Sequence, residues 1–201
     1  GRIVYQELTR ISKAIEDGAF FGNAALNDAI RHCRNTGGAL HIMGLLSDGG
    51  VHSHIDHIKA AISMAASNRI SPIYVHCFMD GRDVPPTSGL GYIQEMEEFL
   101  SNIPGASIGV VSGRYYAMDR DKRWDRVKLA YDALAFGQGR KAQSGSEAVK
   151  MAYDAGETDE FIIPTVCGQA NGVHNGDSII FCNFRPDRAR EITRCFVDDN
   201  F

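Results

Sequence analysis

The stretch ALHIMGLLSDGGVHSHIDH, residues 39–57, predicts a buried strand, a glycine-containing loop and a helix in immediate succession. Residues 39–46 are almost continuously apolar, which is typical of a strand covered on both faces. After the loop, Ile55, Ile58 and Ile62 recur at helical spacing and form one apolar stripe. A strand that leads through such a loop into a helix is the repeating unit of an α/β fold.

The same alternation extends over the rest of the chain. Strands are predicted at 39–46, 72–79, 107–112, 160–166 and 177–183, and helices at 2–17, 23–36, 54–67, 88–101, 122–136, 146–155 and 187–197. Residues 168–177 have Asn-Gly turn signals and no helical period, so we expect the last two strands to form an antiparallel hairpin. We therefore predict a single α/β domain over residues 1–201, a three-layer α/β/α sandwich with a mostly parallel, mixed sheet.

Composition limits the classes of protein to which the chain can belong. Of its 201 residues, 44% are apolar and 23% charged, and the formal net charge is -4, which argues against a broad nucleic-acid-binding surface. Lys122, Arg123 and Arg126 fall on a predicted helix and are expected to face solvent. Five widely spaced cysteines without a Cys-x-x-Cys pair favour reduced thiols and a cytoplasmic location. No apolar run reaches the roughly 18 residues of a membrane span, so no membrane partner is expected.

Polar residues gather where the predicted strands end. In open α/β sheets, ligands bind beyond the carboxyl ends of the strands. Fifteen of the 21 basic residues are arginines, and five of these lie in the loops that follow strands: Arg82, Arg114, Arg120, Arg185 and Arg188. Because the planar guanidinium group suits carboxylate and phosphate, these loops predict an anion-binding site at one end of the sheet.

Several polar residues after the first strand also have an ordinary structural interpretation. Ser53 and Asp56 fit a capping box at the start of a helix. On that helix His54 and His57 would be exposed flank residues. His52 precedes the helix and is the better candidate for a functional role.

Two of the arginine-containing loops have further local signals. Arg82 is followed directly by Asp83 on a loop stiffened by two prolines, which is one way to hold an anion beside a proton acceptor. Pro186 suits the first turn of a helix and would place Arg185 and Arg188 about one turn apart at the positive end of that helix.

A metal site is an alternative interpretation of the loop after the first strand. Asp48, His52, His54 and Asp56 are side chains of the types that bind divalent cations. They would make the chain a self-contained metal-dependent phosphoester hydrolase. A third possibility is an anion-binding regulatory module that carries out no chemistry.

Long motifs in these loops carry a family resemblance. LLSDGGVHSH, DGRDVPP, SGRYYAMDRDKRWDR and NFRPDRAR, with the opening GRIVYQELTRI, resemble the cofactor-independent (2,3-bisphosphoglycerate-independent) phosphoglycerate mutases over essentially all 201 residues. The resemblance implies an isomerase of glycolysis and gluconeogenesis that interconverts 3-phosphoglycerate and 2-phosphoglycerate. It further implies that this chain is the inserted substrate-binding, or phosphotransferase, domain of such an enzyme.

The resemblance also implies roles for particular residues. His52 would contact the substrate, Arg82 would bind it, and Asp83 would be the general base on the glycerate hydroxyl. The arginines that would clamp the carboxylate and phosphate of phosphoglycerate are Arg114, Arg120, Arg185 and Arg188.

Other parts of the enzyme would lie outside this chain. The family resemblance implies an alkaline-phosphatase-like domain of the same polypeptide that supplies a phosphorylatable serine and two Mn²⁺ or other divalent ions. No metal is expected in residues 1–201, and the isolated chain is expected to be inactive. We also expect a monomer that binds neither nucleic acid nor membranes.

Overall fold

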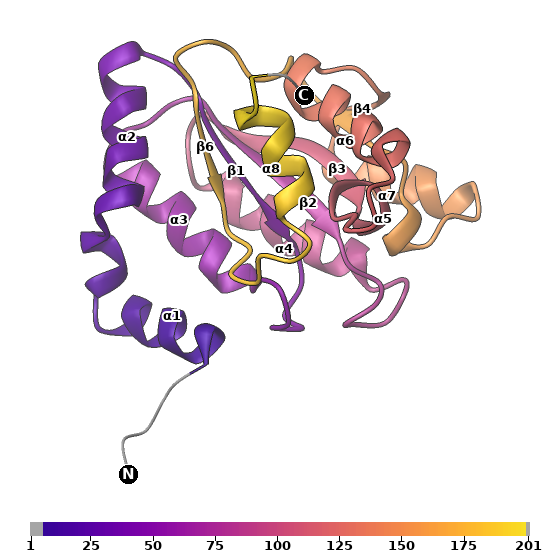
Figure 1. Cartoon of the computed structure of the whole chain (residues 1–201), viewed down its shortest axis with the longest axis horizontal. Helices are drawn as coiled ribbons and strands as arrows, with labels where there is room; N and C mark the ends of the chain where they lie inside the picture. The colour runs from indigo at the N-terminus through magenta and orange to yellow at the C-terminus, as the bar shows by residue number, and fades with distance from the viewer. Residues whose placement is uncertain (1–5, 200–201) are drawn as a thin grey trace.

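Six strands form one central sheet in the computed structural model, which describes residues 6–199 (Figure 1). Their bounds are β1 Leu40–Leu45, β2 Ile73–Met79, β3 Ala106–Gly113, β4 Arg140–Ala142, β5 Thr165–Cys167 and β6 Ser178–Phe181. The spatial order is β4-β5-β3-β2-β1-β6. β6, β1, β2 and β3 are parallel, whereas β5 is antiparallel to β3 and parallel to β4. The predicted mixed, mostly parallel sheet is therefore confirmed.

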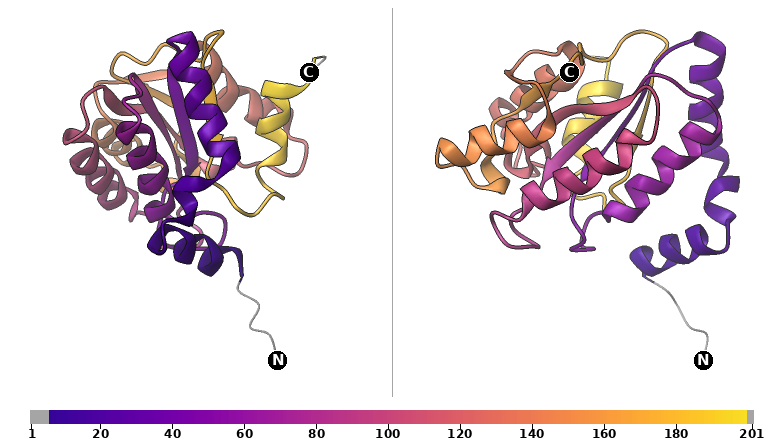
Figure 2. Two further views of the ribbon diagram at one scale, coloured as in Figure 1. Left: turned by 90° about the vertical axis from the view of Figure 1, so that its left-hand side faces the viewer. Right: turned by 180° about the vertical axis from the view of Figure 1, so that it is seen from behind.

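Helices cover both faces of this sheet and give the molecule three layers (Figure 2). One face is covered by α2 Ala24–Thr36, α3 Ile55–Ser67, α4 Gly89–Ser101 and α7 Gly145–Asp154, and the other by α5 Arg114–Ala117, α6 Trp124–Phe136 and α8 Arg190–Val197. α1 Glu7–Glu16 lies beside α3 at the end toward which β1 points. Two 3-10 helices, η1 Ala19–Gly22 and η2 Asp159–Phe161, complete the described elements. The predicted α/β/α sandwich is confirmed.

Alternate side chains of the strands supply two apolar cores. Ile42 of β1 packs in the core beneath α3 with Ile58, whereas the next residue, Met43, belongs to the core on the other face with Leu134 of α6. Every residue of β1 is buried, as its continuous apolar sequence predicts. Each such large side chain contributes about 1.5 to 3 kcal/mol to folding, so the ends of β1 and its neighbours are held rigidly.

The predicted hairpin between the last two strands is wrong. β5 pairs with β3 and β4, whereas β6 lies at the opposite edge of the sheet, parallel to β1. The carboxylate of Asp177 accepts hydrogen bonds from the backbone N–H of Ala39 and from the ring of His41, and so fixes the start of β6 beside β1. The Asn-Gly signals in residues 168–177 correctly indicated turns, but long-range contacts determine which strand β6 joins.

The predicted strand at 160–166 is also displaced. η2 occupies the first part of this segment, and β5 begins only after Pro164, which has no N–H to donate to a sheet. Asp159, in η2, is fully buried and accepts hydrogen bonds from the N–H of Gly89 and the hydroxyl of Tyr153. β4, η1 and α5 were not predicted, because three or four residues are too few to show a period.

The start of α3 corrects the predicted capping box. His54 is the N-cap residue, and its Nδ1 accepts from the backbone N–H of Asp56 at 3.2 Å. Ser53 is buried, and its hydroxyl has no hydrogen-bond partner among residues 6–199. His57 is buried rather than exposed, because α1 covers it and Ser12 hydrogen-bonds its Nε2 at 2.9 Å.

The start of α8 differs from its prediction as well. The helix begins at Arg190, and the backbone N–H of Ala189 bonds the carbonyl of Pro186 in a separate turn. Arg185 and Arg188 therefore lie in the turn before the helix, not in its first turn. The predicted helix at 2–17 corresponds to α1 in its described part, and residues 1–5 lie outside the described residues.

Two further features of the described chain concern membrane-spanning helices and the cysteines. Within residues 6–199, no helix combines the length and the apolar character needed to cross a bilayer. All five cysteines are free thiols, and four of them are buried.

Candidate functional site

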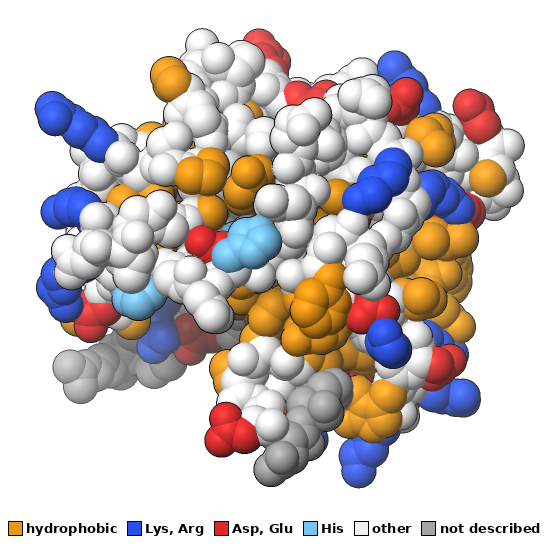
Figure 3. All heavy atoms as spheres, turned by 90° about the horizontal axis from the view of Figure 1, so that it is seen from above, with side chains coloured by type: hydrophobic (Ala, Val, Ile, Leu, Met, Phe, Trp, Pro, Cys, Tyr) orange, Lys and Arg blue, Asp and Glu red, His pale blue; other side chains and the backbone are white. Residues whose placement is uncertain are grey.

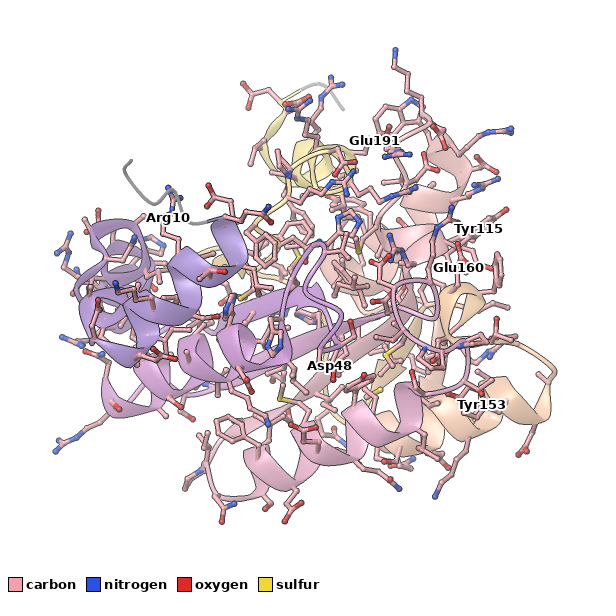
Figure 4. All side chains as sticks on the ribbon, turned by 90° about the horizontal axis from the view of Figure 1, so that it is seen from below. Arg10, Asp48, Tyr115, Tyr153, Glu160 and Glu191 are labelled. Atoms are coloured by element: carbon pink, nitrogen blue, oxygen red, sulfur yellow. The ribbon has the colours of Figure 1, made fainter. Side chains whose placement is uncertain are left out.

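The loops that follow β1, β2, β3 and β6 meet at one end of the molecule, which Figure 4 shows from below. A cavity of about 410 Å³ lies there. It is lined by Arg82, Arg114, Tyr115, Asp119, Arg120, Asp121, Arg126, Glu160, Phe161 and Arg188. Four of the five predicted arginines thus share one cavity. Tyr115 and Glu160, which both line it, lie next to each other in Figure 4.

Asp80, the first residue after β2, organises the loop that carries Arg82 and Asp83. Its Oδ1 accepts from the backbone N–H groups of both residues, at 3.2 and 2.9 Å, while its Oδ2 accepts from the hydroxyl of Ser47 at 2.7 Å. Asp80 is only 2% exposed, so these hydrogen bonds form away from bulk water. The carboxylate joins the end of β2 to the loop after β1.

Gly81 makes the tight path of this loop possible. Its φ of 62° lies in the left-handed region, which side chains disfavour. A Cβ at this position would also lie 2.9 Å from the Cβ of Asp159 and from the backbone nitrogen of Glu160. The loop therefore passes directly over η2, which brings Arg82 within 3.3 Å of the carboxylate of Glu160.

Arg114 begins α5 and points into the polar interior of the site. Its Nη1 donates to Asp80 Oδ1 and to Asp83 Oδ2, both at 2.8 Å, and its Nη2 lies 3.2 Å from Nε2 of His52. Only 3% of its side chain is exposed. Arg114 therefore joins three loops in a buried network. Only Oδ2 of Asp83 takes part in it, and its other carboxylate oxygen has no hydrogen-bond partner among residues 6–199.

His52 is held as a neutral imidazole at physiological pH. Burial lowers the pKa of His52, and the positive charge of Arg114 lowers this pKa further. Its Nδ1 lies 3.8 Å from Oδ1 of Asp187, and neither atom has a hydrogen-bond partner within the described chain. One polar edge of the ring is thus unsatisfied next to the arginine-rich turn after β6.

Asp187 joins two of the predicted arginines in that turn. Arg120 donates to its Oδ2 at 2.8 Å, and Nε of Arg185 lies 3.0 Å from its Oδ1. Burial alone would raise the pKa of Asp187, but Arg120 and Arg185 outweigh that effect and leave the pKa below its ordinary value. Both arginines are more than 40% exposed, so these ion pairs contribute only about 0 to 1 kcal/mol each.

Arg188 lies near three other arginines, Arg120, Arg114 and Arg82. Its Nη1 donates to the backbone carbonyl of Met118 at 3.1 Å, and no carboxylate of residues 6–199 forms an ion pair with it. Burial lowers the pKa of Arg188, and the charges of Arg120, Arg114 and Arg82 lower it further. An anion in the cavity would relieve this repulsion, so the arrangement favours an anionic ligand.

Sequence reasoning identified the arginines but missed the residues that hold them. Asp80 and Asp187 stood inside the quoted motifs, yet their partners are distant in sequence. Glu160 was assigned to a strand. Arg126 was expected to face solvent, but its guanidinium lies 3.9 Å from the centre of the Tyr115 ring and lines the cavity. Only a three-dimensional arrangement reveals these contacts.

The loop after β1 does not assemble the alternative metal site. Asp48 accepts a hydrogen bond from the hydroxyl of Tyr92, His54 caps α3, and Asp56 is exposed. His52 instead contacts Arg114, a cation. Within residues 6–199, no group of three or more His, Cys, Asp or Glu side chains is arranged to hold a metal ion.

The opposite end of the molecule differs in its surface. In Figure 3, the lysine and arginine side chains of that end lie mainly around the edge, and hydrophobic and neutral atoms fill much of the centre. Five arginines line the cavity at the end where β1, β2, β3 and β6 finish, whereas a cavity beside the C-terminal ends of α2 and α3 is lined by two, Arg34 and Arg69. The larger cluster is where a ligand site of an α/β sheet is expected.

Comparisons of the sequence and of the structure with known proteins point to one family. A family model described as "BPG-independent PGAM N-terminus" matches residues 11–201. The 2,3-bisphosphoglycerate-independent phosphoglycerate mutases of Clostridium beijerinckii and Acetivibrio thermocellus are 54% and 55% identical over 206 residues, which cover 100% of this chain. A crystal structure of Leishmania mexicana phosphoglycerate mutase at low cobalt concentration matches with a TM-score of 0.89 and 32% identity, again over 100% of this chain.

The chain is shorter than all of these proteins. It spans 40% of the two bacterial mutases and 39% of the Leishmania mexicana chain. Both the sequence match and the structural match nevertheless extend over the whole chain, including every loop of the arginine-rich end. The chain therefore belongs to the family of N-terminal domains of the cofactor-independent phosphoglycerate mutases.

Proposed function

We propose that this chain is the substrate-binding domain of a phosphoglycerate mutase that interconverts 3-phosphoglycerate and 2-phosphoglycerate. The observation that carries the proposal is the cavity of about 410 Å³ in which Arg188 lies among Arg82, Arg114 and Arg120 without a carboxylate partner in the described chain. Phosphoglycerate carries a phosphate and a carboxylate, and both suit guanidinium groups.

The five predicted arginines at this end of the molecule, four in the cavity and Arg185 beside Asp187, divide into two kinds under this proposal. Arg114 is buried in ion pairs that are costly to break, so its role is to hold Asp83 and His52 in place. Arg82, Arg120 and Arg185 are exposed and form weak pairs, so a ligand can take the place of Glu160 or Asp187 at little cost. These three and Arg188 are the proposed clamp for the carboxylate and phosphate.

Asp83 and His52 are the proposed groups that act on the glycerate. Asp83 receives Arg114 at one carboxylate oxygen, which leaves the other oxygen for a substrate hydroxyl, as a general base requires. His52 is neutral and has an unsatisfied Nδ1 beside the clamp, so it can hydrogen-bond the substrate without adding charge.

The clamp has a clear purpose in a mutase. The phosphoryl group leaves one hydroxyl for an enzyme serine, and the other hydroxyl of the same glycerate must then receive it. Loss of the glycerate between these steps would convert the mutase into a phosphatase. Several arginines that hold the carboxylate throughout prevent this loss, and positioning of this kind supplies much of the rate of a phosphoryl transfer.

The serine and the metal belong to the rest of the polypeptide in this proposal. The residues described here do not fit a divalent cation, since no three of their His, Cys, Asp or Glu side chains are arranged around one point and Nε2 of His52 faces the cation of Arg114. An alkaline-phosphatase-like domain outside residues 1–201 would hold two Mn²⁺ or other divalent ions and the phosphoserine. The chain alone is accordingly expected to bind phosphoglycerate without turning it over, as a cytoplasmic monomer.

Calorimetric titration of the metal-stripped chain with 3-phosphoglycerate tests the proposal. We expect binding that does not depend on metal, and no mutase activity when Mn²⁺ is added to the same sample. Absence of binding at millimolar ligand, or binding only with Mn²⁺, would contradict it. The second outcome would favour a metal-dependent hydrolase instead.

A further inference from the structure

The buried carboxylate of Asp80 is hydrogen-bonded only to groups of the protein. It accepts from the hydroxyl of Ser47, from two backbone N–H groups of its own loop and from Nη1 of Arg114. It is 2% exposed and does not line the cavity, so it cannot touch a ligand there. Any effect of Asp80 on the reaction must therefore pass through the groups that it holds.

The most informative of these groups is Arg114, because a guanidinium has only donors. Its Nη1 is fully directed to Asp80 and Asp83, and this arrangement turns Nη2 toward Nε2 of His52, 3.2 Å away. A donor at that distance requires a lone pair on Nε2. The ring of His52 is neutral, so its single N–H must then be on Nδ1.

The other edge of His52 agrees with this proton assignment. Nδ1 lies 3.8 Å from Oδ1 of Asp187, an oxygen that forms an ion pair with Nε of Arg185 at 3.0 Å but no hydrogen bond in the described chain. An N–H on Nδ1 would point between Asp187 and the arginine turn after β6. The ring would thus offer a hydrogen-bond donor to Asp187, the residue that also holds Arg120 and Arg185, rather than a lone pair that a carboxylate oxygen would repel.

We propose that Asp80 is a positioning residue that acts through Arg114 to fix His52 as the Nδ1–H tautomer, with its donor directed toward Asp187, which holds two arginines beside the anion site. Free histidine side chains prefer the opposite tautomer, with the proton on Nε2. Asp80 and Arg114 reverse that preference before any ligand arrives, which removes the need for a proton rearrangement when an anion binds. The ligand part of this inference rests on the proposed function, whereas the tautomer does not.

Nitrogen NMR of the histidine rings in the ¹⁵N-histidine-labelled chain tests the tautomer directly. A His52→Gln variant assigns the signals. In the unaltered chain, we expect the shift of an unprotonated nitrogen at Nε2 and of a protonated nitrogen at Nδ1. A protonated Nε2 in the unaltered chain overturns the proposal at once.

Two variants test how the tautomer is set. Asp80→Asn keeps the shape and an acceptor oxygen but removes the charge that anchors Arg114, so we expect the Nδ1–H pattern of His52 to be lost. Should this variant not fold, Arg114→Lys makes the same prediction, since a single ammonium group cannot bridge both carboxylates and His52. The matched control is Asp177→Asn, a buried aspartate near the other end of the sheet, which should leave His52 unchanged.

Affinity provides the second measurement. Asp80→Asn should weaken 3-phosphoglycerate binding by about tenfold although Asp80 does not line the cavity, and Asp177→Asn should not weaken it. A folded Asp80→Asn chain with an unchanged His52 tautomer and unchanged affinity contradicts the inference. If the unaltered chain binds no 3-phosphoglycerate, the proposed function fails, and the nitrogen shifts still decide the tautomer.

Discussion

Two networks of side-chain hydrogen bonds, each linking a histidine to an aspartate, lie toward different ends of the sheet. At the carboxyl end, His52 is joined through Arg114 to Asp80. Toward the amino end, the ring of His76 bonds that of His41 at 2.9 Å, and His41 bonds Asp177 at 3.1 Å. The participants are similar in type, and all are buried except for part of Asp177.

The two networks differ in their surroundings. The first contains a cation and adjoins a cavity in which exposed arginines hold only weak ion pairs. The second lies between β1, β2 and β6 and connects the edge strand to its neighbours. A buried polar network that joins neighbouring strands supports the fold, even though Nδ1 of His76 has no hydrogen-bond partner within residues 6–199. A network that adjoins unsatisfied charge is prepared for a ligand. Substitutions should separate these two roles.

The largest effect is expected from Arg114→Met, which leaves Asp80 and Asp83 without their shared cation. A buried charge deprived of its partner typically costs 3 to 5 kcal/mol, so the free energy of unfolding should fall by about that amount. Urea denaturation measures it. A loss below about 1 kcal/mol would show that the buried network does not stabilise this end.

The next effect is a loss of stability in acid. Burial lowers the pKa of His41 and His76, and that of His57 to about 4. Since an unfolded histidine has a pKa near 6.5, the unfolded chain binds protons first as the pH falls below that value, and stability decreases toward pH 4. His57 alone would account for about 3 kcal/mol of this decrease.

Thermal or urea unfolding between pH 7.5 and about pH 4 measures this dependence. His57→Gln should make it shallower, whereas His32→Gln, at an exposed position on α2, should leave it unchanged. A stability that stays constant, or rises, as the pH falls below about 6.5 would contradict the neutral, buried state assigned to these rings.

Arg188→Ala should change binding without a comparable change in stability. Loss of charge-assisted hydrogen bonds predicts a decrease of about 1 to 3 kcal/mol in the free energy of 3-phosphoglycerate binding. Arg34→Ala is the matched control, because Arg34 is an exposed arginine on α2 that bonds Asn68. Equal affinity of the two variants in calorimetry would remove Arg188 from the site.

The smallest effect is expected from Glu160→Gln, which frees Arg82 from its weak pair and removes a negative charge from the cavity wall. Binding of 3-phosphoglycerate should become tighter by less than about 1 kcal/mol, the usual size of an exposed ion pair. Weaker binding by this variant would mean that Glu160 holds Arg82 in the productive position.

The sequence was sufficient for the layers of the fold because β1 is an almost continuous apolar run and α3 has a clear helical period. It was not sufficient for β6, whose place at the far edge depends on Asp177 and on residues about 140 positions away. The same distinction holds in the site. Arginines after strand ends are a local signal, whereas the pairing of Arg114 with Asp80 and the burial of His57 beneath α1 depend on contacts between distant segments.

The most direct test of the anion site is a map of backbone amide shifts during titration of the metal-stripped chain with 3-phosphoglycerate. We expect changes that saturate in residues 80–83, 114–120 and 183–188, and none around His41, His76 and Asp177. Changes centred on the second group, or spread evenly over the surface, would contradict the assignment of ligand binding to the arginine-rich end.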